Sequence, residues 1–193
     1  MIAGLTASLL LVFAVAVGVV IVVALWVVGI YNTLQRARIG AEGAFSNIDV
    51  ELRRRHDLVP NLVETVKGYA THERQTLEAV MQARAAATAA RGMDERMQAE
   101  GELTRGLGRL LAVAEAYPTL KADGNFLRLQ GELTDTENRI ASGRGGFNGA
   151  VRAYNETRSV FPNNLVAGLL GFREIPFLKE DDQTVRAAPQ VKF

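Results

Sequence analysis

Residues 7–30 read ASLLLVFAVAVGVVIVVALWVVGI, an uninterrupted apolar run. As a helix with a rise of about 1.5 Å per residue, this run would reach roughly 36 Å, enough to cross a hydrocarbon core of ~30 Å. A cleaved signal peptide has a basic first region and a shorter apolar stretch, and neither is present here. The run therefore predicts a transmembrane anchor over residues 1–30, with the rings of Trp26 and Tyr31 near the membrane interface.

All charged residues lie beyond this run. The chain has 193 residues with 22 Lys and Arg and 21 Asp and Glu, and none of these precedes Arg36. The near balance of the two signs argues against an electrostatic nucleic-acid binder, so we expect no nucleic acid among the partners. The absence of cysteine excludes a disulfide scaffold and a cysteine-ligated metal site. A single long apolar run also argues against a multi-spanning transporter.

The basic residues lie on one side of the apolar run. No Lys or Arg precedes the run, whereas Arg36 and Arg38 follow it closely and Arg53, Arg54 and Arg55 come further on. Cytoplasmic flanks of membrane helices carry an excess of such residues. We therefore expect the N-terminus outside and the polar domain in the cytoplasm.

Residues 31–161 are rich in helix-forming residues and predict an all-α domain. Periodicity and punctuation divide it into four helical stretches with one further turn at residues 121–125. The stretches run from the anchor to about His56, from about Asp57 to Arg91, from an Asp94 N-cap to Tyr117, and from about Asn125 to Val160. Such short connections suit neighbouring antiparallel helices.

Apolar residues recur along these stretches at alternating steps of four and three, where Arg55, Glu137 and Arg144 occupy the intervening positions. The three stripes are Ala41, Phe45, Ile48, Leu52, Val59, Leu62, Val66 and Tyr69; then Leu103, Leu107, Leu110, Ala114 and Tyr117; then Leu133, Ile140, Phe147, Val151 and Tyr154. This spacing gives each helix one apolar face, which has to be buried against another helix as in a helix bundle or coiled coil.

Pro60 leaves the boundary between the first two stretches open. The first stripe keeps its phase through Pro60, as it would in a single kinked helix. Pro60 fits equally well in the first turn of a new helix capped by Asp57, where its missing N–H costs little. The residues by themselves do not decide between these two interpretations.

Three charged residues, Arg55, Glu137 and Arg144, occupy positions on the apolar stripes. Because a buried ion without a partner costs several kcal/mol, we hypothesise that Arg55 and Glu137 pair across the bundle and fix the helix register. The alternatives are that these charges line a functional groove, or that residues 53–55 form a lipid or partner patch. Candidate interaction or register residues are Arg55, His56, Asp57, Glu137, Asn138 and Arg144.

Sequence motifs for catalysis are missing. His72-Glu73 begins like the zinc-protease helix motif, but that motif needs a second histidine where Thr76 stands. The glycine-rich residues 143–146 have no preceding strand and no following Lys-Ser or Lys-Thr pair. We interpret them as a flexible or close-packed point in the last helix. We expect no catalytic residues, no metal site and no cofactor.

Several blocks of sequence follow one another in a fixed order along the chain. They are Tyr31-Asn32, IDVELRRRHDLVPNLVETVKGYATHE at 48–73, AEAYPTLKADGNFLRLQGELTDTENRIA at 114–141, FNGAVRAYN at 147–155, FP at 161–162 and a PQVKF ending. In these blocks the sequence resembles the LemA family of bacterial membrane proteins, over nearly the whole chain. The resemblance implies an anchor followed by an antiparallel four-helix bundle at residues 31–161, with a helix boundary near Asp57.

The resemblance supplies no reaction. Members of the family are often associated with a membrane M48-type metalloprotease and with other envelope proteins. It therefore implies a non-enzymatic, membrane-anchored scaffold or adaptor of the bacterial inner membrane, acting through protein–protein contacts that include self-association. The alternative is a membrane-associated sensor that binds a peptide or a lipid in a groove of the bundle.

Residues 162–193 contain a short apolar segment followed by a tail. The segment includes Leu165, Val166, Leu169, Leu170 and Phe172 and is too short to span a membrane. It either caps the open end of the bundle or lies in the membrane interface or a partner groove. The last residues have no periodicity and predict an extended tail.

Overall fold

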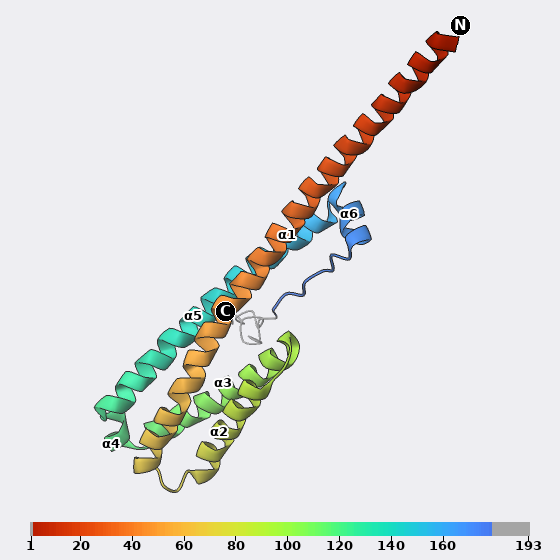
Figure 1. Ribbon diagram of the computed structural model, residues 1–193. Coiled ribbons are helices and arrows are strands. Elements are labelled where there is room, and N and C mark those ends of the chain that lie inside the picture. Colours follow the sequence, from red (N-terminus) through yellow and green to blue (C-terminus); the bar gives the residue numbers. More distant parts are fainter. Residues whose placement is uncertain (1, 179–193) are drawn as a thin grey trace, which may run out of the picture. The chain divides into compact units, whose positions relative to one another are not determined.

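The computed structural model describes the backbone of residues 2–178 and the side chains of residues 9–178. These residues contain helices and no strands, so the all-α class is confirmed (Figure 1). The helices are α1 (Ile2–Tyr69), α2 (Arg74–Ala89), α3 (Met93–Glu115), α4 (Pro118–Lys121), α5 (Gly124–Ser159) and α6 (Asn163–Leu170). The predicted extended tail and the PQVKF ending lie outside the described residues.

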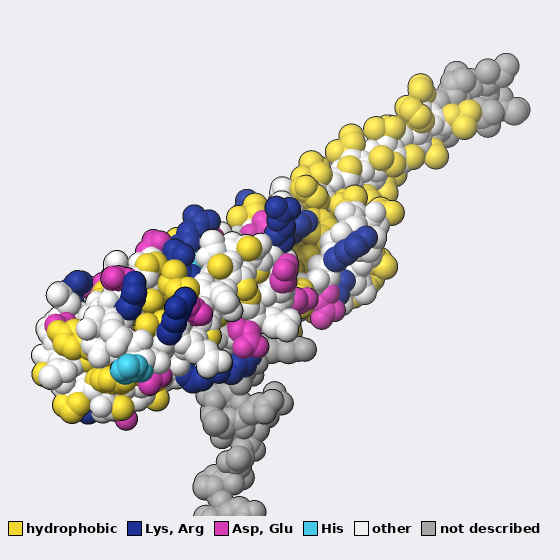
Figure 2. All heavy atoms as spheres, turned by 90° about the horizontal axis from the view of Figure 1, so that it is seen from below, with side chains coloured by type: hydrophobic (Ala, Val, Ile, Leu, Met, Phe, Trp, Pro, Cys, Tyr) yellow, Lys and Arg dark blue, Asp and Glu magenta, His cyan; other side chains and the backbone are white. Residues whose placement is uncertain are grey.

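The N-terminal part of α1 is apolar on every side. Its most apolar window of 18 residues has a mean hydropathy of 3.2, and none of that window is buried. Figure 2 shows this part of the helix covered by hydrophobic side chains. A helix that is apolar all round needs an apolar surrounding. α1 is thus long enough and apolar enough to cross a membrane, as the sequence predicts.

The chain divides into two compact units. Unit 1 holds Met1–Ala44 and Phe147–Phe177. Unit 2 holds Phe45–Gly146 and, of the described residues after Phe177, Leu178. The long helices α1 and α5 each contribute one part to each unit.

The core of unit 2 contains residues from α1, α2, α3, α4 and α5. The predicted stripes supply much of it, and members such as Val59, Leu62, Leu103 and Leu110 are at most 1% exposed. The buried members of this core are Val59, Leu62, Val63, Val66, Ala70, Leu77, Val80, Ala87, Leu103, Leu107, Leu110, Ala114, Leu120, Phe126, Leu129 and Leu133. Most members of the predicted stripes therefore pack in a core, whereas Tyr69 at the end of the first stripe is 41% exposed.

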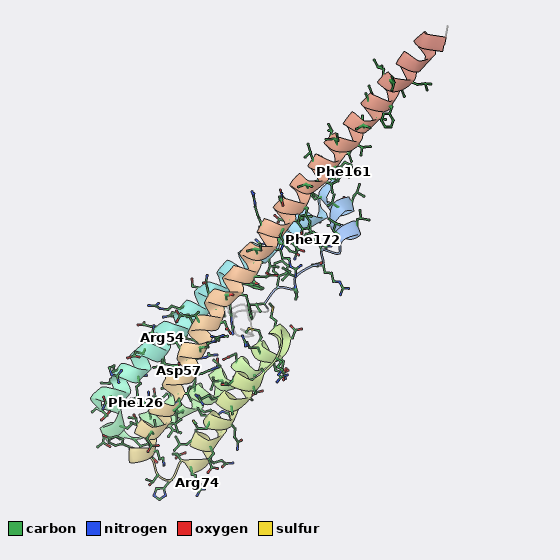
Figure 3. The ribbon with its side chains drawn as sticks, viewed as in Figure 1. Arg54, Asp57, Arg74, Phe126, Phe161 and Phe172 are labelled. Atoms are coloured by element: carbon green, nitrogen blue, oxygen red, sulfur yellow. The ribbon has the colours of Figure 1, made fainter. Side chains whose placement is uncertain are left out.

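The helix α1 continues through Pro60, so the boundary that the resemblance implied near Asp57 is wrong. Pro60 has no N–H to donate to the carbonyl of His56 one turn earlier. That carbonyl instead accepts a hydrogen bond from Nε of Arg84 on α2, at 2.6 Å. Because the acceptor is satisfied from another helix, the proline interrupts one bond without ending the helix. Asp57 lies exposed within α1 rather than at an N-cap (Figure 3).

The first break in the helical chain therefore lies at residues 70–73, later than predicted. The other boundaries fall close to their predicted places. Gly92 separates α2 from α3 with a φ of 85°, a left-handed conformation that favours glycine. Pro118 begins α4 at the first helical position, where its missing N–H costs little. The Oδ1 of Asp123 accepts the N–H of Phe126 at 2.9 Å and caps α5.

The glycine-rich residues 143–146 lie inside α5 without interrupting it. A Cβ added to Gly143 would lie 3.0 Å from Cγ1 of Ile48, whose side chain is buried. The glycine thus allows α5 to approach α1 closely at this point. Of the two interpretations offered by the sequence, Gly143 corresponds to a close-packed point.

Candidate functional site

Arg55 lies on the buried stripe of α1 in unit 2 and is 0% exposed. Its Nη1 donates to Oε2 of Glu137 at 2.6 Å and to Oγ1 of Thr104 at 3.0 Å. Its Nη2 donates to Oε2 of Glu100. The hypothesised contact between Arg55 and Glu137 is present, but Arg55 also binds a second carboxylate on α3.

Glu100 is the member of this network that sequence reasoning missed. It is 0% exposed, and its second carboxylate oxygen lies 2.8 Å from Nε2 of His56. The spacing of the sequence could have identified Glu100. It stands three residues before Leu103 and seven before Leu107, so it extends the α3 stripe by one step. A charged residue in that position has to meet an opposite charge or leave the core.

His56 links the network to α2. Its Nδ1 lies 3.4 Å from Oγ1 of Thr88, while Nε2 faces the carboxylate of Glu100. Because an ionised carboxylate only accepts hydrogen bonds, Nε2 is the nitrogen that carries a proton toward Glu100. We call the set of Arg55, His56, Glu100, Thr104 and Glu137 the charge network.

Two opposing effects act on the Glu100 carboxyl group. Burial favours its neutral form and by itself would raise its pKa. The hydrogen bond from His56 and the charge and hydrogen bond of Arg55 outweigh burial, so the pKa of Glu100 lies below its ordinary value. Glu100 is thus ionised at neutral pH, and its buried negative charge depends on Arg55 and His56.

This lowered pKa predicts a loss of stability in acid. A carboxyl group whose pKa is lower in the folded state contributes stability above its unfolded pKa, here near 4.5, and loses it as the pH falls through its folded pKa. We expect the free energy of unfolding of the full chain, measured by urea titration from about pH 6 to about pH 3, to fall less steeply in Glu100→Gln than in the parent chain.

Glu64→Gln is the matched control, because its side chain is 76% exposed and contacts only Lys67, at 3.4 Å, among the described ion pairs. This variant should keep the pH dependence of the parent chain. An equal slope in Glu100→Gln and the parent would contradict the coupling between the Glu100 proton and folding.

The other predicted site residues lie outside the described contacts of the charge network. Asp57 and Asn138 are exposed, and Arg144 is partly buried with an Nε that has no described hydrogen-bond partner. Glu137 and Asn138 both line a small cavity of about 270 Å³ at α3 and α5. The structure therefore brings Arg55, His56 and Glu137 together and leaves the other three candidates apart. Within the described residues, no group of three or more His, Asp or Glu side chains is arranged to hold a metal ion.

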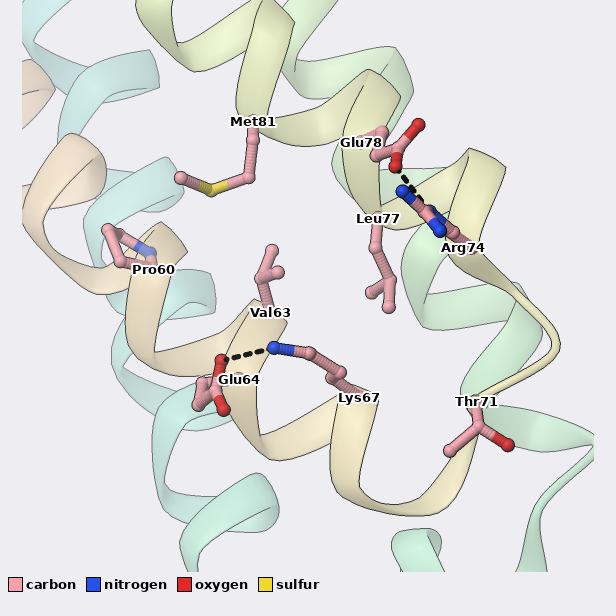
Figure 4. A pocket seen from close by; sticks show the side chains of 9 residues that line it. All are labelled: Pro60, Val63, Glu64, Lys67, Thr71, Arg74, Leu77, Glu78 and Met81. Atoms are coloured by element: carbon pink, nitrogen blue, oxygen red, sulfur yellow. Dashed lines mark hydrogen bonds and ion pairs between the residues drawn. The ribbon is translucent and has the colours of Figure 1, made fainter.

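An open groove lies in unit 2 where the end of α1 meets α2 (Figure 4). Its volume of about 640 Å³ is within the range of small-ligand and peptide sites. The lining residues are Pro60, Val63, Glu64, Lys67, Thr71, Arg74, Leu77, Glu78 and Met81. We call this feature the α1–α2 groove.

The α1–α2 groove combines an apolar wall with a charged rim. Side chains of Val63, Leu77 and Met81 point toward one another across it in Figure 4. On the rim, Lys67 pairs with Glu64 at 3.4 Å and Arg74 pairs with Glu78 at 2.7 Å. Apolar side chains with a polar rim are the usual composition of a surface that binds another protein segment.

Two curated proteins are similar to this chain in sequence. Magnetosome protein MamQ of Magnetospirillum gryphiswaldense is 34% identical over 42% of this chain and 30% of its own length. Magnetosome protein MamQ 2 of Paramagnetospirillum magneticum is 26% identical over 78% of this chain and 65% of its own length. The chain thus spans less than two thirds of the length of these curated relatives.

The family comparison covers most of the chain as one range. The model of the LemA family matches residues 44–193, which include every residue of the charge network and of the α1–α2 groove. The chain belongs to the LemA family.

Proposed function

We propose that this protein is a non-enzymatic, membrane-anchored helical scaffold or adaptor of the bacterial cell envelope, acting through protein–protein contacts. The observation that carries this proposal is the α1–α2 groove, an open apolar surface with a charged rim. The charge network supports a structural role for the stripe charges, because Arg55 is fully buried and its described bonds are to neighbouring helices.

The proposal takes residues 31–161 as an antiparallel four-helix bundle. In unit 2 the corresponding parts of α1, α2, α3 and α5 share one hydrophobic core. The charge network fixes the register of α1 against α3 and α5, since a slip of either partner would separate Arg55 from Glu100 or Glu137. Such a bundle is a rigid support for a binding surface.

We propose the inner membrane as the location, with the N-terminus outside and the helical domain in the cytoplasm. Arg36 and Arg38 directly after the apolar run support this direction. Partners reached by the α1–α2 groove are then membrane proteins with a cytoplasmic segment. A second copy of the chain and an M48-type metalloprotease are the partners that we propose.

A second candidate function is a sensor that binds a peptide or a lipid. The size of the α1–α2 groove favours it, because about 640 Å³ would hold an extended peptide segment or an acyl chain. In this case Lys67 or Arg74 would exchange its present partner for an acidic group of the ligand.

Photo-crosslinking in native membranes distinguishes these functions. A photoreactive amino acid replaces Met81 in the α1–α2 groove of the full chain, or Leu127 as the control. Leu127 lies on α5, is 51% exposed and is not among the groove residues. We expect Met81 to give adducts with this chain or another membrane protein, and Leu127 to give none. Adducts with lipid or short peptides alone would support the sensor. Equal patterns at both positions would overturn the use of the groove in either function.

A further inference from the structure

The segment that follows α5 is uncharged and mostly apolar. No charged residue occurs between Arg158 and Arg173, and this segment contains the short helix α6. We call residues 160–172 the α6 hairpin. The hairpin belongs to unit 1 together with the apolar part of α1.

The inner face of the α6 hairpin packs on α1. Val166, Ala167 and Phe172 form one buried cluster with Ile30 and Leu34. The ring of Phe172 also meets the ring of Tyr31 edge to face, with 5.7 Å between centroids. The apolar side chains on this side of the hairpin are therefore already buried against α1.

The outer face of the α6 hairpin carries large apolar side chains that are exposed. Leu165 is 63% exposed and Leu169 is 83% exposed, and Phe161 before the helix is 78% exposed. Leu165 and Leu169 are four residues apart in α6 and so share one side of this helix, and the exposed Phe161 comes directly before it. A helix in water carries polar residues on its outer side, and an uncovered apolar side indicates that something apolar covers it.

The place where the α6 hairpin meets α1 indicates what covers that outer side. Val27 and Ala37 of α1 also pack against the shared cluster. The contact therefore spans the last turn of the apolar run and the first turns after it. Trp26 and Tyr31 present half-exposed rings at the same level, which is typical of the membrane interface.

Hydrogen bonds hold the hairpin in this position. The hydroxyl of Tyr154 donates to the carbonyl of Arg173 at 2.8 Å. The side chain of Asn155 donates to the carbonyl of Ile175 at 2.9 Å and accepts its N–H at 3.1 Å. Figure 3 labels Phe161 and Phe172, which mark the two ends of the hairpin. Because these bonds tie the chain after α6 to α5, which itself leads directly into α6, the bare face stays at the level of residues 27–37.

We propose that the outer face of the α6 hairpin inserts into the interface of the same bilayer that α1 crosses. Phe161, Leu165 and Leu169 would lie at the boundary of headgroups and acyl chains, as in amphipathic interfacial helices. Arg158 and Arg173 flank the apolar segment at the height of anionic headgroups. This inference rests on α1 as a membrane-spanning helix and is independent of the α1–α2 groove.

The absence of cysteine from the chain provides a direct test. Single substitutions Leu169→Cys and Phe161→Cys in the full chain accept an environment-sensitive fluorophore. The labelled proteins are reconstituted into vesicles of phosphatidylcholine and phosphatidylglycerol that contain spin-labelled lipids. Leu127→Cys, on an exposed site in unit 2, is the control for a water-facing residue. We expect several-fold stronger quenching by shallow spin labels at residues 161 and 169 than at residue 127.

Two further outcomes would overturn the inference. Quenching at residue 169 equal to that at residue 127 would mean that the outer face lies in water. Protection of residue 169 from both spin-labelled lipid and an aqueous quencher would mean that a protein, such as a second copy, covers it. Val17→Cys in α1 tests the premise that α1 spans the bilayer separately from the placement of α6. Quenching at residue 17 by deep spin labels shows that α1 spans the bilayer. Without quenching at residue 17, the premise itself would fail.

Discussion

Replacing Arg55 with methionine is expected to lower the free energy of unfolding of the full chain by about 3–5 kcal/mol. Arg55 is fully buried and donates to both Glu100 and Glu137. Its removal leaves the buried carboxylate of Glu100 with His56 as its remaining described partner. A buried charge that loses its counter-ion costs far more than an exposed pair, and this asymmetry sets the expected magnitude. Urea unfolding in detergent micelles, followed by circular dichroism, measures the change.

Arg53→Met is the matched control for this substitution. Arg53 lies two residues away on the same helix, but its side chain is 75% exposed and pairs with Asp49 one turn earlier. Exposed pairs of this kind contribute at most about 1 kcal/mol, so Arg53→Met should have a much smaller effect. Equal losses in the Arg53 and Arg55 variants would contradict the assigned role of burial.

The double substitution Arg55→Met with Glu100→Met provides a second control. Replacing both members of a buried ion pair with apolar residues of similar volume is often neutral or stabilising. We expect the double variant to recover most of the stability lost in Arg55→Met. No recovery would mean that the loss comes from packing of the long Arg55 side chain rather than from the unpaired Glu100.

The charge network was predictable in part, and the reason lies in local periodicity. Arg55 and Glu137 interrupt apolar stripes, so the sequence indicates that each needs a partner. Glu100 extends the α3 stripe in the same way, but the next position of the stripe, four residues earlier, is the charged Arg96, so Glu100 resembles a position beyond the end of the stripe. What periodicity does not provide is the depth of each residue. Glu100 is fully buried, whereas the side chain of Glu137 remains 43% exposed.

The helix boundaries show a second limit of local reasoning. The stripe of α1 and the N-cap pattern at Asp57 supported opposite interpretations of Pro60. The decisive interaction comes from Arg84, which is distant in sequence and reaches the carbonyl of His56 only after α2 has folded back. The position of α6 is a similar case. Its composition shows an apolar segment, but only packing on residues 27–37 indicates which surface its outer face meets.

Replacing Pro60 with alanine is expected to raise the free energy of unfolding by about 2 kcal/mol. Proline inside a helix is less favourable than alanine by about 3 kcal/mol, and the greater flexibility of alanine in the unfolded chain cancels roughly 0.4–1 kcal/mol of that gain. Alanine also supplies the N–H that the carbonyl of His56 lacks in the present helix. Urea unfolding of the full chain measures the difference.

The effects of Pro60→Ala and Arg84→Ala on the free energy of unfolding should depend on each other. With Pro60 present, Arg84→Ala leaves the His56 carbonyl without its described donor and should cost about 1–3 kcal/mol. With alanine at residue 60, the helix supplies its own donor and the same substitution should cost much less. Arg105→Ala on α3 is the control, since Arg105 pairs locally with Glu102 at 2.5 Å and should have the same small effect in both backgrounds. Additive effects of Pro60→Ala and Arg84→Ala would contradict the exchange of donors.

Pro60 also lines the α1–α2 groove. A Pro60→Ala chain that is more stable but loses the crosslinks formed at Met81 would show that the proline serves binding at a cost in stability.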